Sequence, residues 1–357
     1  MNSKIQNLQK KLPGIGDAAL IFSEVDRLYF TGFPASDGIL VVGCNETCQF
    51  ITDKRYSEAA ARKLGDGNVT ASSDFYADAD KLLRSAGQST VAIENERLTL
   101  SAFDELQKKL PDYRFRSDSA LCDAINELRM FKSNDEVNKI LAAQKIAEDA
   151  FDYILGFIAP GKTEREIALA LDFFMLSHGA QALSFETIAV SGVNSSMPHG
   201  VPSDKKIEDG DFITMDYGAV VDGYHSDMTR TVAVGHVSER QKLIYRTVLE
   251  AQLAGLAALK DGVTGKDADK AARDVIEAAG FGEQFTHSTG HGVGVEIHEA
   301  PYLSTKSGYT LHTGNVVTVE PGIYLPGECG VRIEDMALIT EDGARNLTNC
   351  PKELIIL

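Results

Sequence analysis

The sequence predicts an α+β fold in two domains, a smaller N-terminal α/β domain over residues 1–128 and a larger C-terminal domain over residues 129–357. A length of 357 residues suits two domains of ordinary size. Short β-rich runs alternate with helical patterns along the whole chain. The charge is also uneven, because residues 1–130 hold 16 Lys and Arg against 19 Asp and Glu, whereas residues 131–357 hold 19 against 33.

The N-terminal third has the pattern of a sheet with helices. Residues 38–42 and 48–52 are β-rich runs separated by a polar turn, which favours a hairpin. Ser101 with Asp104 resembles a capping box, so we expect a helix to open there and to end before Pro111. This region shows neither a catalytic constellation nor a glycine-rich phosphate loop.

Four helices are predicted in the C-terminal region. Ser133–Glu136, Thr163–Glu166 and Ser238–Gln241 are capping boxes that open three of them, and the fourth covers roughly residues 266–279. The β-rich runs between and after these helices lie at residues 211–215, 219–221, 228–234, 315–320 and 330–339. Antiparallel hairpins and helices in this order predict helices packed on one face of a sheet.

Composition excludes several classes of protein. A formal net charge of −17 argues against binding to duplex nucleic acid or to anionic membranes, since both require basic surface. The five cysteines are scattered without CxxC spacing, which argues against a disulfide framework or a zinc cage. The N-terminus lacks the apolar core of a signal peptide, and no uncharged apolar run reaches the ~18 residues of a membrane span. We therefore expect a reduced, cytoplasmic protein.

All eight histidines lie in the acidic C-terminal region, where a hairpin also places two acids close together. Asp222-Gly223 is a strong two-residue hairpin turn. With these residues as the loop, Asp216 faces Thr229, and Asp216 and Asp227 become diagonal neighbours, roughly 7–8 Å apart between their backbones. Two carboxylates this close repel each other unless a cation lies between them, although the stretch alone is also typical of solvated hairpin acids.

Three further segments carry candidate ligands. His291 lies among glycines, and because it is seven residues from His298 the two could share a cavity only through a bulge or a turn. Glu320 ends a β-rich run before a Pro-Gly turn, and alternation places Arg332 and Glu334 on one face. Two Asp, one His and two Glu make a coherent ligand set for two divalent ions, which together can activate water. This donor set favours Mn²⁺ or Co²⁺ and is compatible with Zn²⁺.

These motifs resemble the pita-bread metallopeptidases, and within them the proline-specific branch of Xaa-Pro dipeptidase (prolidase) and aminopeptidase P. The resemblance rests on the Asp216–Asp227 spacing, the Thr289–Glu299 stretch, Glu320-Pro-Gly and Arg332–Asp335, and it extends over essentially the whole chain. It implies a pita-bread catalytic domain behind a creatinase-like N-terminal α/β domain.

The resemblance also implies a role for each matching position. The implied ligands of two divalent ions are Asp216, Asp227, His291, Glu320 and Glu334. His199 would help to bind substrate and move protons, His298 would contact the scissile carbonyl oxygen, and Glu320 would accept a proton. His287 and Arg332 would line the side that receives proline, with Tyr324 in the same pocket.

The activity implied is hydrolysis of the peptide bond before proline in small peptides, by a homodimer. The compact length favours a dipeptidase, and an aminopeptidase acting on longer peptides is the alternative. A methionine aminopeptidase would share the five ligands but commonly lacks the N-terminal domain. A creatinase-type amidinohydrolase works without the metal ligands, and a non-catalytic peptide-binding module of the same fold has lost ligands that this sequence retains.

Overall fold

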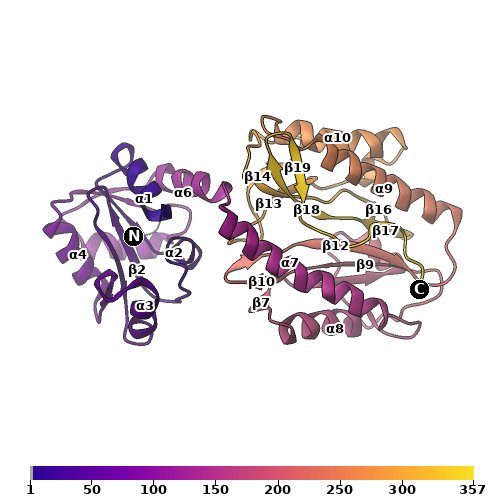
Figure 1. Ribbon diagram of the computed structural model, residues 1–357, viewed down its shortest axis with the longest axis horizontal. Helices are drawn as coiled ribbons and strands as arrows, with labels where there is room; N and C mark the ends of the chain where they lie inside the picture. Colours follow the sequence, from indigo (N-terminus) through magenta and orange to yellow (C-terminus); the bar gives the residue numbers. More distant parts are fainter. Residues whose placement is uncertain (1–2) are drawn as a thin grey trace. The chain divides into compact units, whose positions relative to one another are not determined.

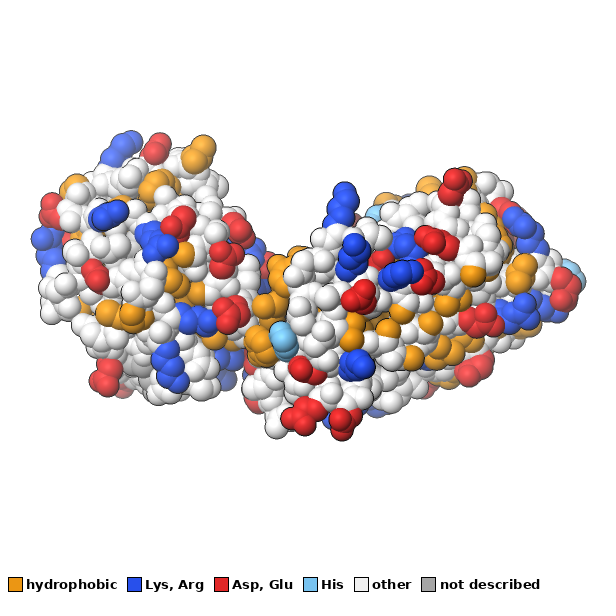
Figure 2. Space-filling model, turned by 90° about the horizontal axis from the view of Figure 1, so that it is seen from above, with side chains coloured by type: hydrophobic (Ala, Val, Ile, Leu, Met, Phe, Trp, Pro, Cys, Tyr) orange, Lys and Arg blue, Asp and Glu red, His pale blue; other side chains and the backbone are white. Residues whose placement is uncertain are grey.

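The computed structural model describes residues 3–357, which divide into two compact units, Met1–Arg129 and Met130–Leu357 (Figure 1). Among these residues, no helix combines the length and the apolar character that crossing a membrane requires. On the face shown in Figure 2, acidic and basic side chains are interspersed with hydrophobic ones, which is typical of a solvated surface.

The first unit contains one six-stranded sheet with the strand order β4-β3-β2-β1-β5-β6. Its strands are β1 (Ala18–Ile21), β2 (Ile39–Gly43), β3 (Cys48–Thr52), β4 (Val69–Ala71), β5 (Thr90–Ile93) and β6 (Arg114–Arg116). Its helices are α1 (Ser3–Lys11), α2 (Glu24–Thr31), α3 (Ser57–Leu64), α4 (Phe75–Ser85), α5 (Leu100–Lys109) and α6 (Ala120–Met130), with the short 3-10 helices η1 (Leu12–Gly14) and η2 (Asp66–Asn68). Apolar residues of β1, β2, β3 and β5 form a core with α4 and α5.

The predicted hairpin is confirmed, because β2 and β3 pair antiparallel with Val42 opposite Cys48. The predicted capping box at Ser101 and Asp104 is wrong. The N-cap of α5 is Thr99, which has extended backbone angles and accepts a hydrogen bond from the backbone N–H of Ala102. Thr99 caps one of the free N–H groups of the first turn, so Ser101 lies inside that turn.

The second unit contains four long helices and four small sheets. The helices are α7 (Asn134–Leu155), α8 (Glu164–Ser177), α9 (Glu239–Ala258) and α10 (Gly265–Ala278), with the short 3-10 helices η3 (Gly192–Ser196) and η4 (Gly282–Gln284). The first seven strands are β7 (Ala182–Leu183), β8 (Ile188–Ser191), β9 (Phe212–Tyr217), β10 (Ala219–Val221), β11 (Tyr224–His225), β12 (Met228–Ala233) and β13 (Gly290–Gly292). The other six are β14 (Glu299–Leu303), β15 (Val316–Val319), β16 (Gly322–Leu325), β17 (Cys329–Arg332), β18 (Asp335–Thr340) and β19 (Gly343–Asn346). The sheet orders are β11-β10-β7, β12-β9-β8, β14-β13-β15-β18-β19 and β16-β17.

The helices lie on the outside of the strands. Figure 1 shows α7 and α8 along one side of the strands and α9 and α10 along the other. All three predicted capping boxes are present, at Ser133, Thr163 and Ser238. Along β9, Ile213, Met215 and Tyr217 enter the core formed with α7 and α8. Because side chains alternate along a strand, the intervening residues of β9 face away from these helices, toward the middle of the unit.

The β-rich run that the sequence predicted at residues 330–339 does not form one continuous strand. It divides into β17 and β18, which pair with β16 and β15, respectively. Ile333 and Glu334 lie between them, and the backbone N–H of Glu334 donates to the carbonyl of Thr229 on β12. This long-range hydrogen bond takes Glu334 out of both ladders and directs it toward β12.

Candidate active site

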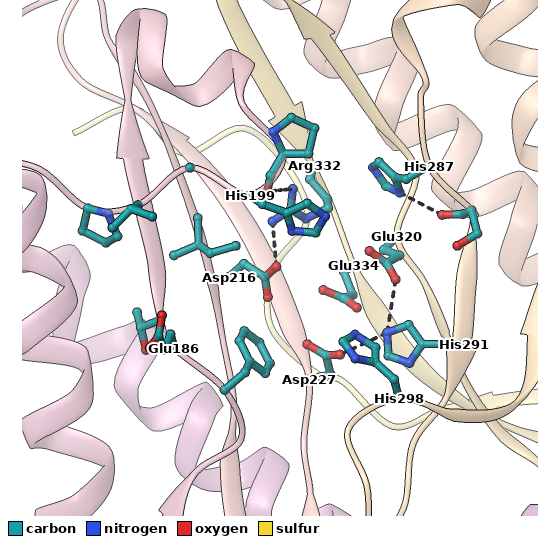
Figure 3. Close-up of a pocket in the computed structure, with 18 of the residues that line it drawn as sticks. Glu186, His199, Asp216, Asp227, His287, His291, His298, Glu320, Arg332 and Glu334 are labelled. Carbon is teal, nitrogen blue, oxygen red and sulfur yellow. Dashed lines mark hydrogen bonds and ion pairs between the residues drawn. The ribbon is translucent and has the colours of Figure 1, made fainter. Parts of the chain in front are cut away.

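A cavity of about 470 Å³ in the second unit brings the predicted site residues together (Figure 3). Nine of the ten predicted residues line this cavity: His199, Asp216, Asp227, His287, His291, His298, Glu320, Arg332 and Glu334. The tenth, Tyr324, is buried behind the wall, where its hydroxyl bonds to two of the lining residues. Predicted site residues separated by as much as 135 positions in sequence, His199 and Glu334, therefore share one cavity.

The two aspartates come from the predicted hairpin. Asp222 and Gly223 both have positive φ, 49° and 76°, which is the geometry of a type I′ turn. Asp216 lies opposite Thr229, as the sequence predicted. Oδ2 of Asp216 accepts a hydrogen bond of 2.6 Å from Arg332, whereas its Oδ1 is buried without a hydrogen-bond partner among residues 3–357.

A turn after β13 brings the two predicted histidines together. The ring centroids of His291 and His298 are 4.4 Å apart. The chain can fold back here because Gly292 and Gly294 leave room, since a Cβ on either residue would lie 2.3–2.4 Å from oxygen atoms of residues 299–300. Nδ1 of His291 lies 3.0 Å from the carbonyl of Gly292, so Nδ1 is the donor of this hydrogen bond and Nε2 faces the carboxylates of the cavity.

The two glutamates complete the set. Glu320 follows β15, as predicted, and its Oε1 lies 3.3 Å from Nε2 of His291 and 3.2 Å from the hydroxyl of Thr318. Oε2 of Glu334 accepts a hydrogen bond of 2.7 Å from Thr229. Oδ2 of Asp227 lies 3.5 Å from Nε2 of His291, so the single imidazole of His291 faces the carboxylates of both Asp227 and Glu320.

The cluster holds more negative charge than its own donors neutralise. Burial, followed by the charge of Asp216, raises the pKa of Asp227 well above its usual range, and burial with neighbouring carboxylates does the same to the pKa of Glu334. Burial also raises the pKa of Asp216, although Arg332 opposes the shift. For Glu320, burial is outweighed by the hydrogen bond and charge of His291, which lower its pKa to about 2. These carboxylates compete for too few positive groups.

These residues fit divalent metal ions. One ligand atom from each of Asp227, His291 and Glu334 lies within 4.8 Å of the other two, and all three residues are buried. The unpartnered Oδ1 of Asp216 provides a further oxygen donor. A cation among these atoms would satisfy the free oxygen and remove the repulsion that raises the carboxylate pKa values.

A chain of hydrogen bonds borders the cavity on one side. Nη1 of Arg332 donates to the hydroxyl of Tyr324 at 2.8 Å, and this hydroxyl lies 2.8 Å from Nε2 of His287. Nδ1 of His287 lies 2.8 Å from the carbonyl of Ser288, so Nδ1 is the donor and Nε2 accepts from Tyr324. Burial lowers the pKa of His287 and raises that of Tyr324 to about 12, which keeps both groups neutral at pH 7.

Sequence reasoning missed several residues of the site. Thr229 and Thr318 bond to the glutamates, and the segment Phe185–Ile188 lines the cavity. Two signals were available for the threonines, because Thr229 is the hairpin partner of Asp216 and Thr318 lies on the same strand face as Glu320. Residues 185–188 carried no comparable signal.

Comparison with known proteins identifies the family. Residues 138–341 match the model of metallopeptidase family M24, and residues 4–131 match the Creatinase/Prolidase N-terminal domain. The chain belongs to metallopeptidase family M24. Its two-domain fold is that of the pita-bread Xaa-Pro peptidases, as the sequence predicted.

Similar proteins with solved structures or curated names cover nearly the whole M24 chain. An Xaa-Pro dipeptidase from Bacillus anthracis is 42% identical, covers 99% of both chains and has a TM-score of 0.95. An X-Pro aminopeptidase from Thermotoga maritima MSB8 is 38% identical, covers 96% of this chain and 98% of its own, and has a TM-score of 0.90. An Xaa-Pro dipeptidase from Pyrococcus furiosus is 39% identical over 95% of both chains. This M24 peptidase is therefore a prolidase-like hydrolase of a family that uses divalent metal.

Proposed function

We propose that this M24 peptidase is a metal-dependent exopeptidase that hydrolyses the peptide bond before proline, with Xaa-Pro dipeptides as its preferred substrates. The observation that carries the proposal is the buried cluster of four carboxylates and one imidazole in a single cavity, with too little positive charge of its own. The names of the similar proteins support proline specificity and small peptide substrates.

The proposed ligands belong to two divalent ions per chain, with Mn²⁺ favoured over Co²⁺ and Zn²⁺. They are Asp216, Asp227, His291, Glu320 and Glu334. When bound, the ions would act as Lewis acids and would lower the pKa of bound water, so that hydroxide becomes available at neutral pH. Asp227 and Glu334 would contact both ions, and each of these two carboxylates is buried among other acids of the cavity.

Three side chains of this site would handle protons and charge during the reaction. Glu320 is ionised at neutral pH, so its carboxylate can accept a proton from the attacking water. Burial and the charge of His291 lower the pKa of His298, which leaves a neutral imidazole whose N–H can donate to the scissile carbonyl oxygen. His199 lines the same cavity and is the proposed second proton carrier.

His287, with Tyr324 and Arg332 behind it, forms the wall that we propose receives proline. The His287 ring is held by hydrogen bonds at both nitrogens, because Nδ1 donates to Ser288 and Nε2 accepts from Tyr324, so it presents a fixed and neutral surface. The amide nitrogen of proline has no N–H and its ring is apolar, so this wall needs no acceptor for that nitrogen.

A second candidate, an aminopeptidase that acts on longer peptides, is favoured by the charges of the cavity. Among the described residues that line it, Arg332 is the one Lys or Arg. Its guanidinium already donates to Asp216, Tyr324, Thr229 and the carbonyl of Pro198. The cavity of this unit thus offers no uncommitted cation to the carboxylate of an Xaa-Pro dipeptide.

Hydrolysis of a dipeptide and a tripeptide decides between the candidates. The purified chain loaded with Mn²⁺ is given Xaa-Pro and Xaa-Pro-Yaa with the same first residue, and kcat/KM is compared. Faster dipeptide hydrolysis supports the dipeptidase, and cleavage of the tripeptide alone overturns it. Glu320→Gln is expected to lower kcat at least a hundredfold at full metal loading. Unchanged turnover at full loading would contradict the role of Glu320.

We propose further that the enzyme is a homodimer that works in a reducing compartment such as the cytoplasm, and that its domains are residues 1–128 and 129–357. The exposed apolar face of α8, formed by Leu169, Phe173 and Leu176, supports self-association. All five cysteines are free thiols, which suits a reducing compartment. The two compact units support the domain division. Light scattering after size-exclusion chromatography tests the dimer.

A further inference from the structure

Glu186 differs from the other charged side chains of the cavity. Each of the others has a partner inside the protein, because Asp216 pairs with Arg332, Asp227 and Glu320 face His291, and Glu334 bonds to Thr229. Glu186 is an exposed residue, and its carboxylate has no hydrogen bond or ion pair within residues 3–357. The single arginine of the cavity is committed to other groups, so the charge of Glu186 is not balanced from within the site.

The backbone at Glu186 is fixed on both sides. Ser184 is buried and donates its hydroxyl to the carbonyls of Ala219 and Ser226, at 2.9 and 2.8 Å. Thr187 is also buried and donates to Oδ1 of Asp172 at 2.5 Å. These hydrogen bonds hold the backbone of Glu186 at the cavity wall before any ligand arrives, so binding has to order only its side chain.

The surroundings of Glu186 suit a long side chain with a charged tip. Phe185, Ile188, Val201 and Pro202 line the same cavity and are apolar. Lysine and arginine have apolar stems that cover apolar surface while their cationic heads remain in water or meet an acid. A pocket wall with an apolar stretch and one free carboxylate therefore complements a lysine or arginine side chain better than it complements a neutral side chain.

The position of Glu186 indicates which substrate residue it meets. Figure 3 shows Glu186 on the opposite side of the cavity from His287, with Asp216 and Asp227 between them. If proline lies against His287, as proposed above, the residue before proline extends from the reaction centre toward Glu186. We propose that Glu186 is a specificity-determining residue that selects substrates with lysine or arginine immediately before proline. This proposal rests on the proposed function.

A comparison of matched peptides tests this selection. Lysyl-proline and norleucyl-proline have side chains of similar length and differ in the terminal ammonium, and the glycine-extended tripeptides provide the same pair if longer peptides are preferred. Ion pairs near a protein surface contribute up to a fewfold in affinity. We therefore expect kcat/KM to favour the lysyl peptide by about threefold to fivefold in the wild-type holoenzyme, Glu186→Gln to abolish this ratio, and Glu186→Lys to reverse it.

A matched control removes the same charge elsewhere. Glu283 is exposed and lies outside this cavity, so Glu283→Gln is expected to leave the ratio unchanged. The preference is also expected to weaken as salt rises from 50 to about 500 mM, because screening acts on solvated charges. A ratio that is independent of salt would contradict an ion pair with Glu186.

Two results of the peptide comparison would also overturn the proposal. One is a wild-type enzyme without preference for the lysyl peptide. The other is an equal loss on both peptides in Glu186→Gln, which would show that the carboxylate meets the α-ammonium group that both peptides share. If neither peptide is hydrolysed, the proposed function fails. Calorimetric binding of lysyl-proline and norleucyl-proline to the wild type and to Glu186→Gln then still measures the preference for the cation.

Discussion

Both units of this M24 peptidase bury carboxylates, but they satisfy them differently. In the first unit, Glu94 is fully buried and accepts hydrogen bonds from the backbone of Phe22 and from the backbone and hydroxyl of Ser23, while Asp26 pairs with Arg129 at 3.0 Å. At the proposed metal site of the second unit, the four carboxylates of Asp216, Asp227, Glu320 and Glu334 share the imidazole of His291 and the guanidinium of Arg332. Glu94 thus has several donors of its own, although burial and Asp26 still raise its pKa, whereas a group of carboxylates with too few donors forms a binding site for a cation.

Two adjacent residues show the same contrast at closer range. Glu334 enters the cavity, where burial and other carboxylates raise its pKa. Asp335, the next residue, is fully buried and is bonded at 2.7–3.1 Å by four side chains, namely Arg230, Gln252, Asn346 and Lys352. One position in sequence thus separates a proposed metal ligand from a structural anchor, because successive side chains of an extended segment point to opposite faces.

The largest effect is expected for a variant that removes one of the proposed metal ligands. Asp227→Asn removes a carboxylate whose pKa burial and Asp216 raise well above the usual range. We expect at least a hundredfold loss of turnover together with lower metal content, because a proposed ligand is lost. We also expect the metal-free variant to be at least as stable as the wild type, because one repelling charge is gone. Activity assays, elemental analysis and urea unfolding in chelator measure these three effects, and retention of metal and activity would contradict the ligand role.

The second prediction concerns a carboxylate of the second unit that is fully satisfied. Glu164, at 0% exposure, accepts six hydrogen bonds of 2.6–3.2 Å from Ser191, Asn194 and Ser203, which flank the loop that carries His199. Glu164→Gln replaces one carboxylate oxygen, which accepts hydrogen bonds, with an NH2 group that faces hydrogen-bond donors. We expect the free energy of unfolding, measured in urea, to fall by about 2–4 kcal/mol, with metal content unchanged.

The neighbouring Glu166 provides the matched control for this variant. Glu166 is exposed and completes the capping box of α8, a role that glutamine also fills. Glu166→Gln is therefore expected to unfold close to the wild type. Equal losses of stability in the two variants would show that the six hydrogen bonds of Glu164 have no special weight.

The smallest effect is expected in the first unit, where Glu94 makes stability depend on pH. Burial, with a contribution from Asp26, raises the pKa of Glu94 from 4.5 to about 7. Between these values the folded chain binds a proton that the unfolded chain has lost, so stability falls as pH rises from about 4.5 through 7, by at most about 3 kcal/mol. Urea unfolding between pH 5 and pH 8 should show a steeper fall for the wild type than for Glu94→Gln. Parallel curves would contradict this linkage, and activity should be retained in the variant.

Local patterns in the sequence predicted much of the site. Asp222-Gly223 fixed the hairpin register, which placed Asp216 opposite Thr229 as observed. The capping boxes at Ser133, Thr163 and Ser238 were correct because each depends on hydrogen bonds within one helical turn. Family resemblance supplied the ligand positions, which the cavity brings together although their roles stay proposals.

Longer-range contacts decided what local patterns could not. The predicted strand at residues 330–339 breaks because Glu334 bonds to the backbone of Thr229, about a hundred residues away. The chain from Arg332 through Tyr324 to His287, and the exposure of Glu186 at the wall of the cavity, likewise join segments that no short window connects. The sequence by itself determined turns, helix starts and the supply of acids and histidines, because these depend on neighbouring residues. Only the tertiary structure decided which acids find donors and which remain for a cation, because this depends on partners brought together by packing.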